Sequence, residues 1–283
     1  MSDNKIPVNR AILWILLSTL FISGSAFMGW LYYLHRREHK FHDDQYRIVA
    51  LVQNSPQADV LKTVYLAELL DLSLDRPVNL YQFNIRDATQ TLLNHPIIKD
   101  VSIKKILPGT LYINYSMRTP LAFIGDFANT AIDEEGYLFP FRPFFTPKRL
   151  PTIYLGVNRD ECKWGSCLKS FIPVQTAFDL LRQFECLEKE RLYLKQLDVT
   201  HIEADSYGKR QIVMIVEKKE EKGDESFSHP LMILRLSSDH TELDLANFRS
   251  FQATLFEKKG KTLNPDKPLI LDFRIPHLAF IRN

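Results

Sequence analysis

The chain has 283 residues, nearly twice the ~150 of a common single domain, so we expect two compact domains or one domain with an anchor. A composition of 45% apolar and 25% charged residues is typical of globular proteins and excludes collagen-like and fully disordered classes. The formal charge of +2 is unevenly divided, because residues 1–40 carry five basic and two acidic side chains. The remaining residues are close to neutral, which leaves no large basic surface for nucleic acid.

An uncharged segment occupies residues 11–34. As a helix it would span about 36 Å, enough to cross a hydrocarbon core of about 30 Å. Trp14 and Trp30 lie near its two ends, as in the aromatic belts of membrane helices. The alternative is a cleaved signal peptide with small residues at 23–26, but the apolar region of such a peptide is usually only about 7–15 residues long. The pattern therefore favours one transmembrane helix.

The polar segment that follows, residues 35–45, is expected to be a juxtamembrane linker. Basic side chains flank the apolar segment on both sides, so the positive-inside rule gives no orientation. His35 and His39, four residues apart, could share a metal ion, but a collar beside anionic lipid headgroups is the favoured interpretation. The flanking bases are Lys5 and Arg10 on one side and Arg36, Arg37 and Lys40 on the other.

Residues 46–119 predict a small α+β module in the order β-α-α-β-β. Ser55 and Pro56 are a plausible N-cap and first helical residue, and Asn84 is a plausible cap for a second helix. The Pro-Gly pair at 108–109 is a strong hairpin signal. The expected elements are a strand at 46–53, helices at about 56–70 and 85–94, and strands at 97–106 and 111–117.

Beyond residue 120 the pattern is strand-rich with two amphipathic helices, which predicts a second α+β domain large enough to bury its own core. A charged run at 217–225 is expected to be a solvated loop. The expected strands lie at 192–202, 211–217, 231–236 and 269–275, and the expected helices at 173–188 and 242–256.

The common catalytic motifs are absent from the sequence, which contains no G-x-S-x-G, phosphate loop, H-E-x-x-H or dinucleotide fingerprint. Asp133, Glu134 and Glu135 could be imagined as acid/base groups for glycan cleavage, but three acids before a glycine indicate a tight turn. Cys162 and Cys167 are compatible with a disulfide-closed loop in an oxidising compartment, with free thiols as the alternative. We therefore expect no enzymatic activity, cofactor, metal site or small-molecule substrate.

The last strand offers a binding edge on physical grounds. Its apolar residues alternate with Asp272 and Arg274, so one face would lie on the core. Pro276 withdraws a backbone donor, which is tolerated mainly at a sheet edge or a strand end. An edge strand followed by the apolar residues 277–281 could accept a strand from another protein. The alternative is an ordinary internal strand with a frayed tail.

The motifs that follow the predicted helices resemble those of the FtsQ/DivIB family of bacterial cell-division proteins, which contain a POTRA module. The run HPIIKDVSIKKILPGTL at 95–111 is similar to the family's strand pair. RTPLA at 118–122 resembles its Arg-x-Pro-x-Ala step, and DEEG at 133–136 resembles its Asp-x-x-Gly turn. The resemblance covers nearly the whole chain, including the single N-terminal anchor. Its departures are Gln53 in place of a frequent glycine, Met117 in place of an acidic residue, and an insertion at 156–172 with no counterpart.

This resemblance implies a non-enzymatic, bitopic scaffold at the division septum that recruits and links early and late division proteins. The N-terminus would be cytoplasmic, and the bulk of the chain would lie outside the cytoplasm at the inner membrane. The alternative is a membrane-anchored envelope hydrolase or transferase. The implied parts are a cytoplasmic tail (1–10), a transmembrane helix (11–34), a juxtamembrane linker (35–45), a POTRA domain (46–119) and a C-terminal β domain (120–283).

The family also implies partners and contacts. Its last strands pair with a segment of an FtsB/DivIC-like protein, which in turn binds an FtsL-like protein, and its POTRA module is implicated in recruitment by other division proteins of the membrane. For recruitment, the exposed hairpin suggests Lys104, Lys105 and Pro108. For the FtsB/DivIC-like partner, the candidate contacts are Phe273, Arg274, Ile275, Pro276, His277, Leu278 and Ala279.

Overall fold

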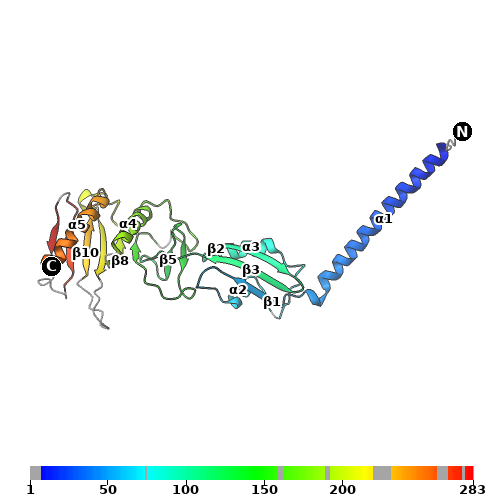
Figure 1. Cartoon of the computed structure of the whole chain (residues 1–283), viewed down its shortest axis with the longest axis horizontal. Coiled ribbons are helices and arrows are strands. Elements are labelled where there is room, and N and C mark those ends of the chain that lie inside the picture. The colour runs from blue at the N-terminus through cyan, green and yellow to red at the C-terminus, as the bar shows by residue number, and fades with distance from the viewer. Residues whose placement is uncertain are drawn as a thin grey trace. The chain divides into compact units, whose positions relative to one another are not determined.

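The computed structural model describes residues 8–73, 75–158, 162–188, 192–218, 231–259, 267–275 and 278–282 (Figure 1). Contacts between residues divide the chain into two compact units. Two short segments from the first half of the chain belong to unit 2, and from Ser116 onward the whole chain belongs to it. Unit 1 comprises Met1–Asn54, Lys62–Leu92 and Val101–Tyr115, and unit 2 comprises Ser55–Leu61, Leu93–Asp100 and Ser116–Asn283.

The first element is one long helix, α1 (Val8–His42), which continues beyond the end expected at residue 34. It is long and apolar enough to cross a membrane, since the most apolar 18 residues within Ile12–His42 have a mean hydropathy of 1.8. Trp14 and Trp30 expose 70% and 62% of their surface, so among the described residues of unit 1 none covers these side chains. Ser18 donates a hydrogen bond to the carbonyl oxygen of Ile15 at 2.9 Å, which satisfies a polar group within the apolar helix.

The C-terminal end of α1 is fixed by side chains of unit 1. Asn79, which is 7% exposed, donates hydrogen bonds to the carbonyl oxygens of Lys40 at 3.0 Å and Asp43 at 3.3 Å. Gln82 donates to the carbonyl oxygen of Phe41 at 3.1 Å. The last carbonyls of a helix have no partner within it, so these amides cap α1 before the short 3-10 helix η1 (Asp44–Tyr46) begins.

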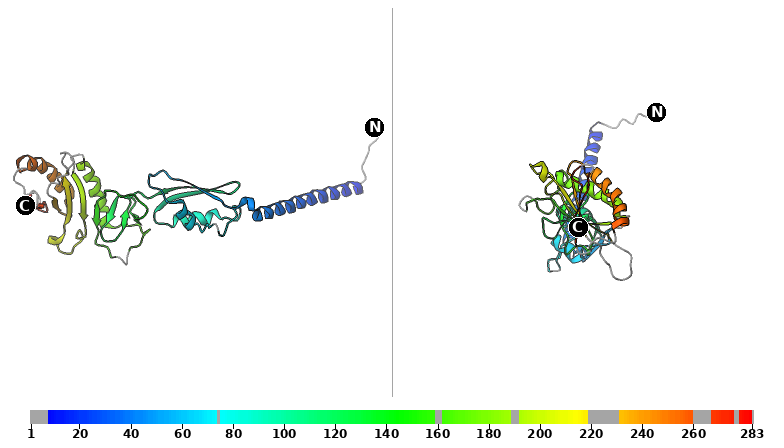
Figure 2. Two further views of the ribbon diagram at one scale, coloured as in Figure 1. Left: turned by 90° about the horizontal axis from the view of Figure 1, so that it is seen from below. Right: turned by 90° about the vertical axis from the view of Figure 1, so that its left-hand side faces the viewer.

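The body of unit 1 centres on a three-stranded sheet in the order β1-β3-β2, with two helices on one face (Figure 2). Strand β1 pairs parallel to β3. Leu111, Ile113 and Tyr115 alternate inward along β3 and are 2% exposed or less, which builds the core under the helices. The elements are β1 (Ala50–Asn54), α2 (Thr63–Leu69), α3 (Ile85–Leu93), β2 (Ile98–Ile106) and β3 (Thr110–Met117).

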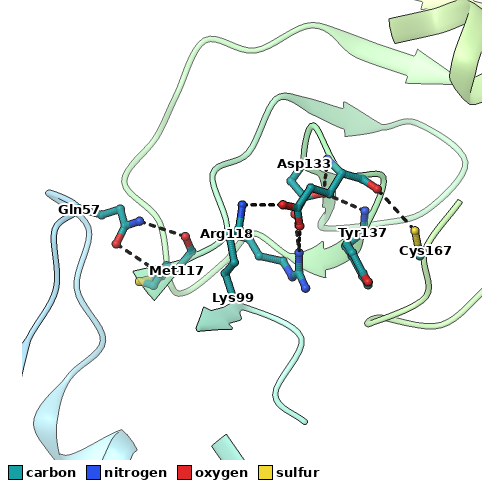
Figure 3. Close-up of polar contacts among 8 residues, drawn as sticks. Gln57, Lys99, Met117, Arg118, Asp133, Tyr137 and Cys167 are labelled. Atoms are coloured by element: carbon teal, nitrogen blue, oxygen red, sulfur yellow. Dashed lines mark hydrogen bonds and ion pairs between the residues drawn. The ribbon is translucent and has the colours of Figure 1, made fainter. Parts of the chain in front are cut away.

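The prediction that the first helix of this unit begins at Ser55 and Pro56 is wrong, because α2 begins only at Thr63. Ser55 Oγ instead donates to Gln57 Oε1 at 2.9 Å. The Gln57 amide exchanges two hydrogen bonds of 3.2 Å with the backbone of Met117 (Figure 3). A contact with a strand far along the chain therefore replaces the local helix start. By contrast, the Asn84 cap is confirmed, since Asn84 Oδ1 accepts from the amide of Arg86 at 3.0 Å.

Unit 2 contains a nine-stranded mixed sheet in the order β12-β11-β10-β9-β8-β7-β4-β5-β6. Helices α4 and α5 lie side by side on the sheet (Figure 2). The strands are β4 (Ala122–Ile124), β5 (Thr130–Ile132), β6 (Leu138–Pro140), β7 (Thr152–Tyr154), β8 (Leu192–Asp198), β9 (Ile212–Lys218), β10 (Met232–Leu236), β11 (Leu269–Asp272) and β12 (Phe280–Arg282), and the helices are α4 (Ile172–Glu188), η2 (Tyr207–Lys209) and α5 (Thr241–Lys259).

The prediction of a strand over residues 269–275 is correct at its start but wrong at its end. Strand β11 ends at Asp272, whose carboxylate accepts hydrogen bonds from the backbone and side chain of Arg274 at 3.1 and 2.7 Å. These bonds turn the chain out of the strand. Strand β11 is also internal, because it pairs parallel to β10 and antiparallel to β12.

The structure confirms an apolar N-terminal helix followed by an α+β body with mixed sheets. The charged run at 217–225 lies mostly outside the described residues. Both predicted C-terminal helices are present and contribute to one hydrophobic core with the strands. In that core the rings of Phe248 and Phe273 are 6.3 Å apart, and both side chains are 2% exposed or less.

Replacing Phe248 by alanine should test this core. Loss of the ring and the resulting cavity should lower the free energy of unfolding by about 3–5 kcal/mol. Leu243→Ala on the same helix is the matched control, because Leu243 is 42% exposed and its loss should cost less than about 1 kcal/mol. Denaturant titrations of the two full-length variants in detergent would measure both values, and similar losses would contradict the assignment of Phe248 to the core.

Candidate functional site

The strongest candidate interaction site is the edge formed by β12. This strand pairs with β11 through the partners Ile270↔Arg282, Leu271↔Ile281 and Asp272↔Phe280. In the part of the chain that the structure describes, no strand lies on the other side of β12. The outer backbone groups of such a strand can pair with a strand from another protein.

Exposed apolar side chains gather at the same edge. Phe280 and Ile281 in β12 are 55% and 38% exposed. Ile275 and Leu278, which precede the strand, are 51% and 54% exposed. Large apolar side chains grouped on a surface are typical of interaction sites, so this edge offers both backbone pairing and apolar contact.

The opposite edge of the sheet, at β6, is covered. The amide of Leu138 donates to the carbonyl oxygen of Ser166 at 3.0 Å, and the amide of Gly165 donates to that of Leu138 at 2.7 Å. Trp164 Nε1 also donates to Thr130 Oγ1 at 3.1 Å. The insertion at 156–172 therefore supplies a backbone partner for β6. A covered edge of this kind cannot pair with a strand from another chain.

The predicted partner contacts divide into buried and exposed groups. The side chain of Phe273 is 2% exposed, and its amide donates to the carbonyl oxygen of Arg235 at 2.9 Å, so this residue belongs to the core. Burial would raise the pKa of Asp272, but its hydrogen bonds with Arg274 keep that pKa below its ordinary value. Arg274 is thus held in an ion pair of 2.7 Å rather than extended toward solvent.

Ile275, Leu278 and Ala279 are exposed beside β12, whereas Pro276 and His277 lie outside the described residues. Sequence reasoning missed the strand residues Phe280–Arg282. The apolar run at 277–281 was the available signal, but local pattern alone does not identify which strand ends a sheet.

A hollow of about 440 Å³ adjoins this edge. Ile275 and Phe280 line it together with Ser237 and Arg210. A strand added to β12 could place a side chain in this hollow, so the site combines a backbone edge with a lateral recess.

The predicted recruitment site lies at the turn between β2 and β3. Lys104 and Pro108 are exposed, and Lys105 is half-buried, which lowers the pKa of its ammonium group. Ile106 and Leu107 beside them are 47% and 61% exposed. The hairpin tip therefore presents apolar and basic side chains together.

The acidic turn at 133–136 contains a structural ion pair, in which Asp133 contacts Arg118 (Figure 3). Arg118 Nη1 lies 2.7 Å from Asp133 Oδ2, and the two side chains are only 12% and 6% exposed. Asp133 Oδ1 also accepts from the amides of Glu135 at 3.0 Å and Tyr137 at 2.8 Å. The Arg118 guanidinium lies 3.8 Å from the ring centroid of Tyr137. Asp133 therefore holds the turn through its ion pair and two amide hydrogen bonds, and the Arg118–Tyr137 contact adds to it.

Two further carboxylates belong to this turn: Glu134 is exposed, and Glu135 lies at the rim of the cluster. Lys99 Nζ lies 2.7 Å from Glu135 Oε1, and this hydrogen bond lowers the pKa of Glu135 and raises that of Lys99. Gly136 has a φ of +85°, and a Cβ there would lie 2.8 Å from the backbone nitrogen of Lys169. The tight turn expected from Asp-x-x-Gly is therefore confirmed, and glycine is required in it.

Cys162 and Cys167 are not joined by a disulfide in the structure. Cys167 Sγ donates to the carbonyl oxygen of Glu135 at 3.5 Å, and Cys162 packs against the core of unit 2. A disulfide between them stays a prediction. His35 and His39 have Nε2 atoms 3.2 Å apart, but no group of three or more metal-ligating side chains occurs among the described residues.

No protein-family model matches this chain, and no curated protein matches it. Its function therefore has to be inferred from the residues and geometry of these sites.

Removal of Asp133 should test the buried ion pair. Asp133→Ala would leave the buried Arg118 with only its longer ion pair to Glu135 at 3.4 Å and would leave two turn amides without their acceptor, so the free energy of unfolding should fall by about 3 kcal/mol. The matched control is Asp179→Ala, because the Asp179–Arg182 pair is 62% and 72% exposed and should contribute less than about 1 kcal/mol. Thermal and denaturant unfolding would measure both, and equal effects would show that the Arg118 pair is no more important than a surface pair.

Proposed function

We propose that the protein is a non-enzymatic, bitopic scaffold of the bacterial division machinery, of the FtsQ/DivIB type. The observation that carries the proposal is the open edge at β12, which ends a sheet whose other edge is covered. The order β-α-α-β-β over residues 50–117 supports it as well, because this is the order expected of a POTRA module.

The proposed mechanism is strand addition. A segment of an FtsB/DivIC-like partner pairs with the outer side of β12, and its side chains contact the exposed Ile275, Leu278 and Phe280. An FtsL-like protein joins through that partner. Helix α1 holds the scaffold in the inner membrane at the septum, where restriction to a plane raises the effective concentration of partners. Modest interfaces are then sufficient for assembly.

A second contact is proposed for recruitment by other division proteins. Lys104, Lys105 and Pro108 at the β2–β3 turn, with the exposed Ile106 and Leu107, offer a mixed basic and apolar surface. This surface lies in a different part of the chain from β12, so recruitment and linkage would use separate sites.

The alternative function, an envelope hydrolase or transferase, has less support. Such chemistry needs two carboxylates that converge on a substrate. Asp133 is instead 6% exposed, paired with Arg118 and bonded to two backbone amides. A carboxylate held in this way stabilises a turn and has no free oxygen face for a substrate.

The strand-addition mechanism predicts the effect of Ile275→Lys. A charge at the exposed edge should abolish recovery of the FtsB/DivIC-like partner, because its apolar contact would be replaced by a strongly hydrated ammonium group. Leu243→Lys on α5 is the matched control, since Leu243 is also exposed but lies on a helix. Pull-down from membranes and circular dichroism would give binding and folding separately. Unchanged recovery of the partner with Ile275→Lys would refute strand addition at this edge.

The proposed orientation predicts the behaviour of a fused reporter. Alkaline phosphatase joined after residue 283 should be active, because it folds only outside the cytoplasm, whereas the same enzyme joined before residue 1 should be inactive. Activity in whole cells measures both fusions. Activity of the N-terminal fusion alone would reverse the orientation.

A further inference from the structure

A second hollow occurs at the other end of the sheet in unit 2, among β4, β5 and β6. Its volume is about 560 Å³. Four phenylalanines line it, and the ring centroids of Phe123 and Phe141 are 4.9 Å apart and those of Phe141 and Phe145 5.4 Å apart. Phe127 completes this aromatic wall. Because β12 stands at the opposite end of the strand order, the hollow is separate from the proposed partner edge.

Residues 141–148 form one wall of the hollow, and hydrogen bonds hold this loop at its start and near its end. Asn129 donates to the carbonyl oxygen of Arg142 at 2.9 Å and accepts from its amide at 2.7 Å. Asp59 accepts from the amide and hydroxyl of Thr146 at 3.0 and 2.9 Å and pairs with Lys148 at 2.7 Å. The Lys148 ammonium lowers the pKa of Asp59, so this pair persists at neutral pH. A wall fixed in this way is preorganised for binding.

The two uncharged polar side chains of the lining, Asn129 and Thr130, already form hydrogen bonds within the protein. The Asn129 amide is engaged with the backbone of Arg142. Thr130 Oγ1 donates to the carbonyl oxygen of Ala128 at 3.1 Å and accepts from Trp164 at 3.1 Å. A sugar needs several fixed polar partners for its hydroxyl groups, and these two side chains do not offer them. Selection in this hollow therefore rests on apolar contact and on charge.

The charges at the hollow are positive, because Arg142 and Lys148 line it and none of the other described residues in its lining is acidic. Asp59 already neutralises Lys148. The exposed guanidinium group of Arg142 has no hydrogen-bond or ion-pair partner among the described residues. Its planar donors are suited to bind a carboxylate through two parallel hydrogen bonds.

We propose that this hollow binds a peptide segment of a partner protein in which a phenylalanine-like side chain stands beside an aspartate or glutamate. The aromatic side chain packs among Phe123, Phe127 and Phe141, where ring pairs add to the gain from burial. The adjacent carboxylate pairs with Arg142. The site does not depend on β12, so it gives the scaffold a second binding surface for a protein on the same sheet.

Fluorescence anisotropy with labelled hexapeptides tests this site on the full-length protein in lipid nanodiscs. The probes are Gly-Ser-Phe-Glu-Ser-Gly, the same peptide with Phe-Gln, and the same peptide with Ala-Glu. We expect the Phe-Glu peptide to bind about threefold more tightly than the Phe-Gln peptide, since an ion pair with the exposed Arg142 contributes less than about 1 kcal/mol, and about tenfold more tightly than the Ala-Glu peptide, since one buried ring is sufficient for such a factor.

Variants of the protein separate the charge from the aromatic wall. Arg142→Gln should remove the preference for Phe-Glu over Phe-Gln while weak binding of both persists. Phe127→Glu should weaken all three peptides by placing a carboxylate at the wall. The matched control is Arg182→Gln, because the Arg182 side chain is 72% exposed on α4 and should change nothing. Ile275→Lys should bind the Phe-Glu peptide like the wild type, which separates this site from the proposed partner edge.

Several results would overturn the proposal. These are no measurable binding of the Phe-Glu peptide, equal binding of Phe-Glu and Phe-Gln peptides by the wild type, or an unchanged preference in Arg142→Gln. Displacement of the peptide by a tetramer of N-acetylglucosamine would also overturn it, because the hollow would then be a glycan site.

Discussion

The two edges of the unit 2 sheet are the constraint on which the rest of the arrangement depends. Each edge of an open sheet presents backbone donors and acceptors that must be paired, covered or left for another chain. At β6 the insertion supplies hydrogen bonds through Gly165 and Ser166. At β12 the described part of the chain supplies none on the outer side. Within the described part of the chain, the insertion therefore leaves the sheet with one uncovered edge, at β12.

The buried ion pair and the covered edge are parts of one local structure. Asp133 holds the turn that follows β5, and the same turn provides two acceptors for the covering segment. The carbonyl oxygen of Glu135 accepts from Cys167, and that of Gly136 accepts from the amide of Leu168 at 2.8 Å. The Arg118 guanidinium thus stabilises, through Asp133, the turn against which the cover of β6 lies. A loss of this pair would affect the edge as well as the turn.

Sequence patterns predicted the elements whose signals are local. Helix α1, the Asn84 cap of α3 and the turn after β2 follow from apolar length, a capping side chain and a Pro-Gly pair. The start of α2 could not be predicted, because the Gln57 amide pairs with Met117 sixty residues away. The strands β4 to β7 are three residues long, too short for a periodic signal. The edge position of β12 depends on the order of nine strands, which no local pattern contains.

The two binding surfaces proposed for this sheet differ in how they recognise a partner. An open strand binds mainly through backbone hydrogen bonds, so it tolerates many partner sequences and depends on side chains chiefly at its apolar positions. The aromatic hollow has a fixed wall, and Asn129, Thr130 and Lys148 are paired within the protein, so the proposed site depends on one aromatic anchor and on the charge of Arg142. Because β12 and β6 end the same continuous sheet, both surfaces can be occupied at once without competing for one strand. If the protein is the proposed scaffold, the strength of one contact is separate from the selectivity of the other.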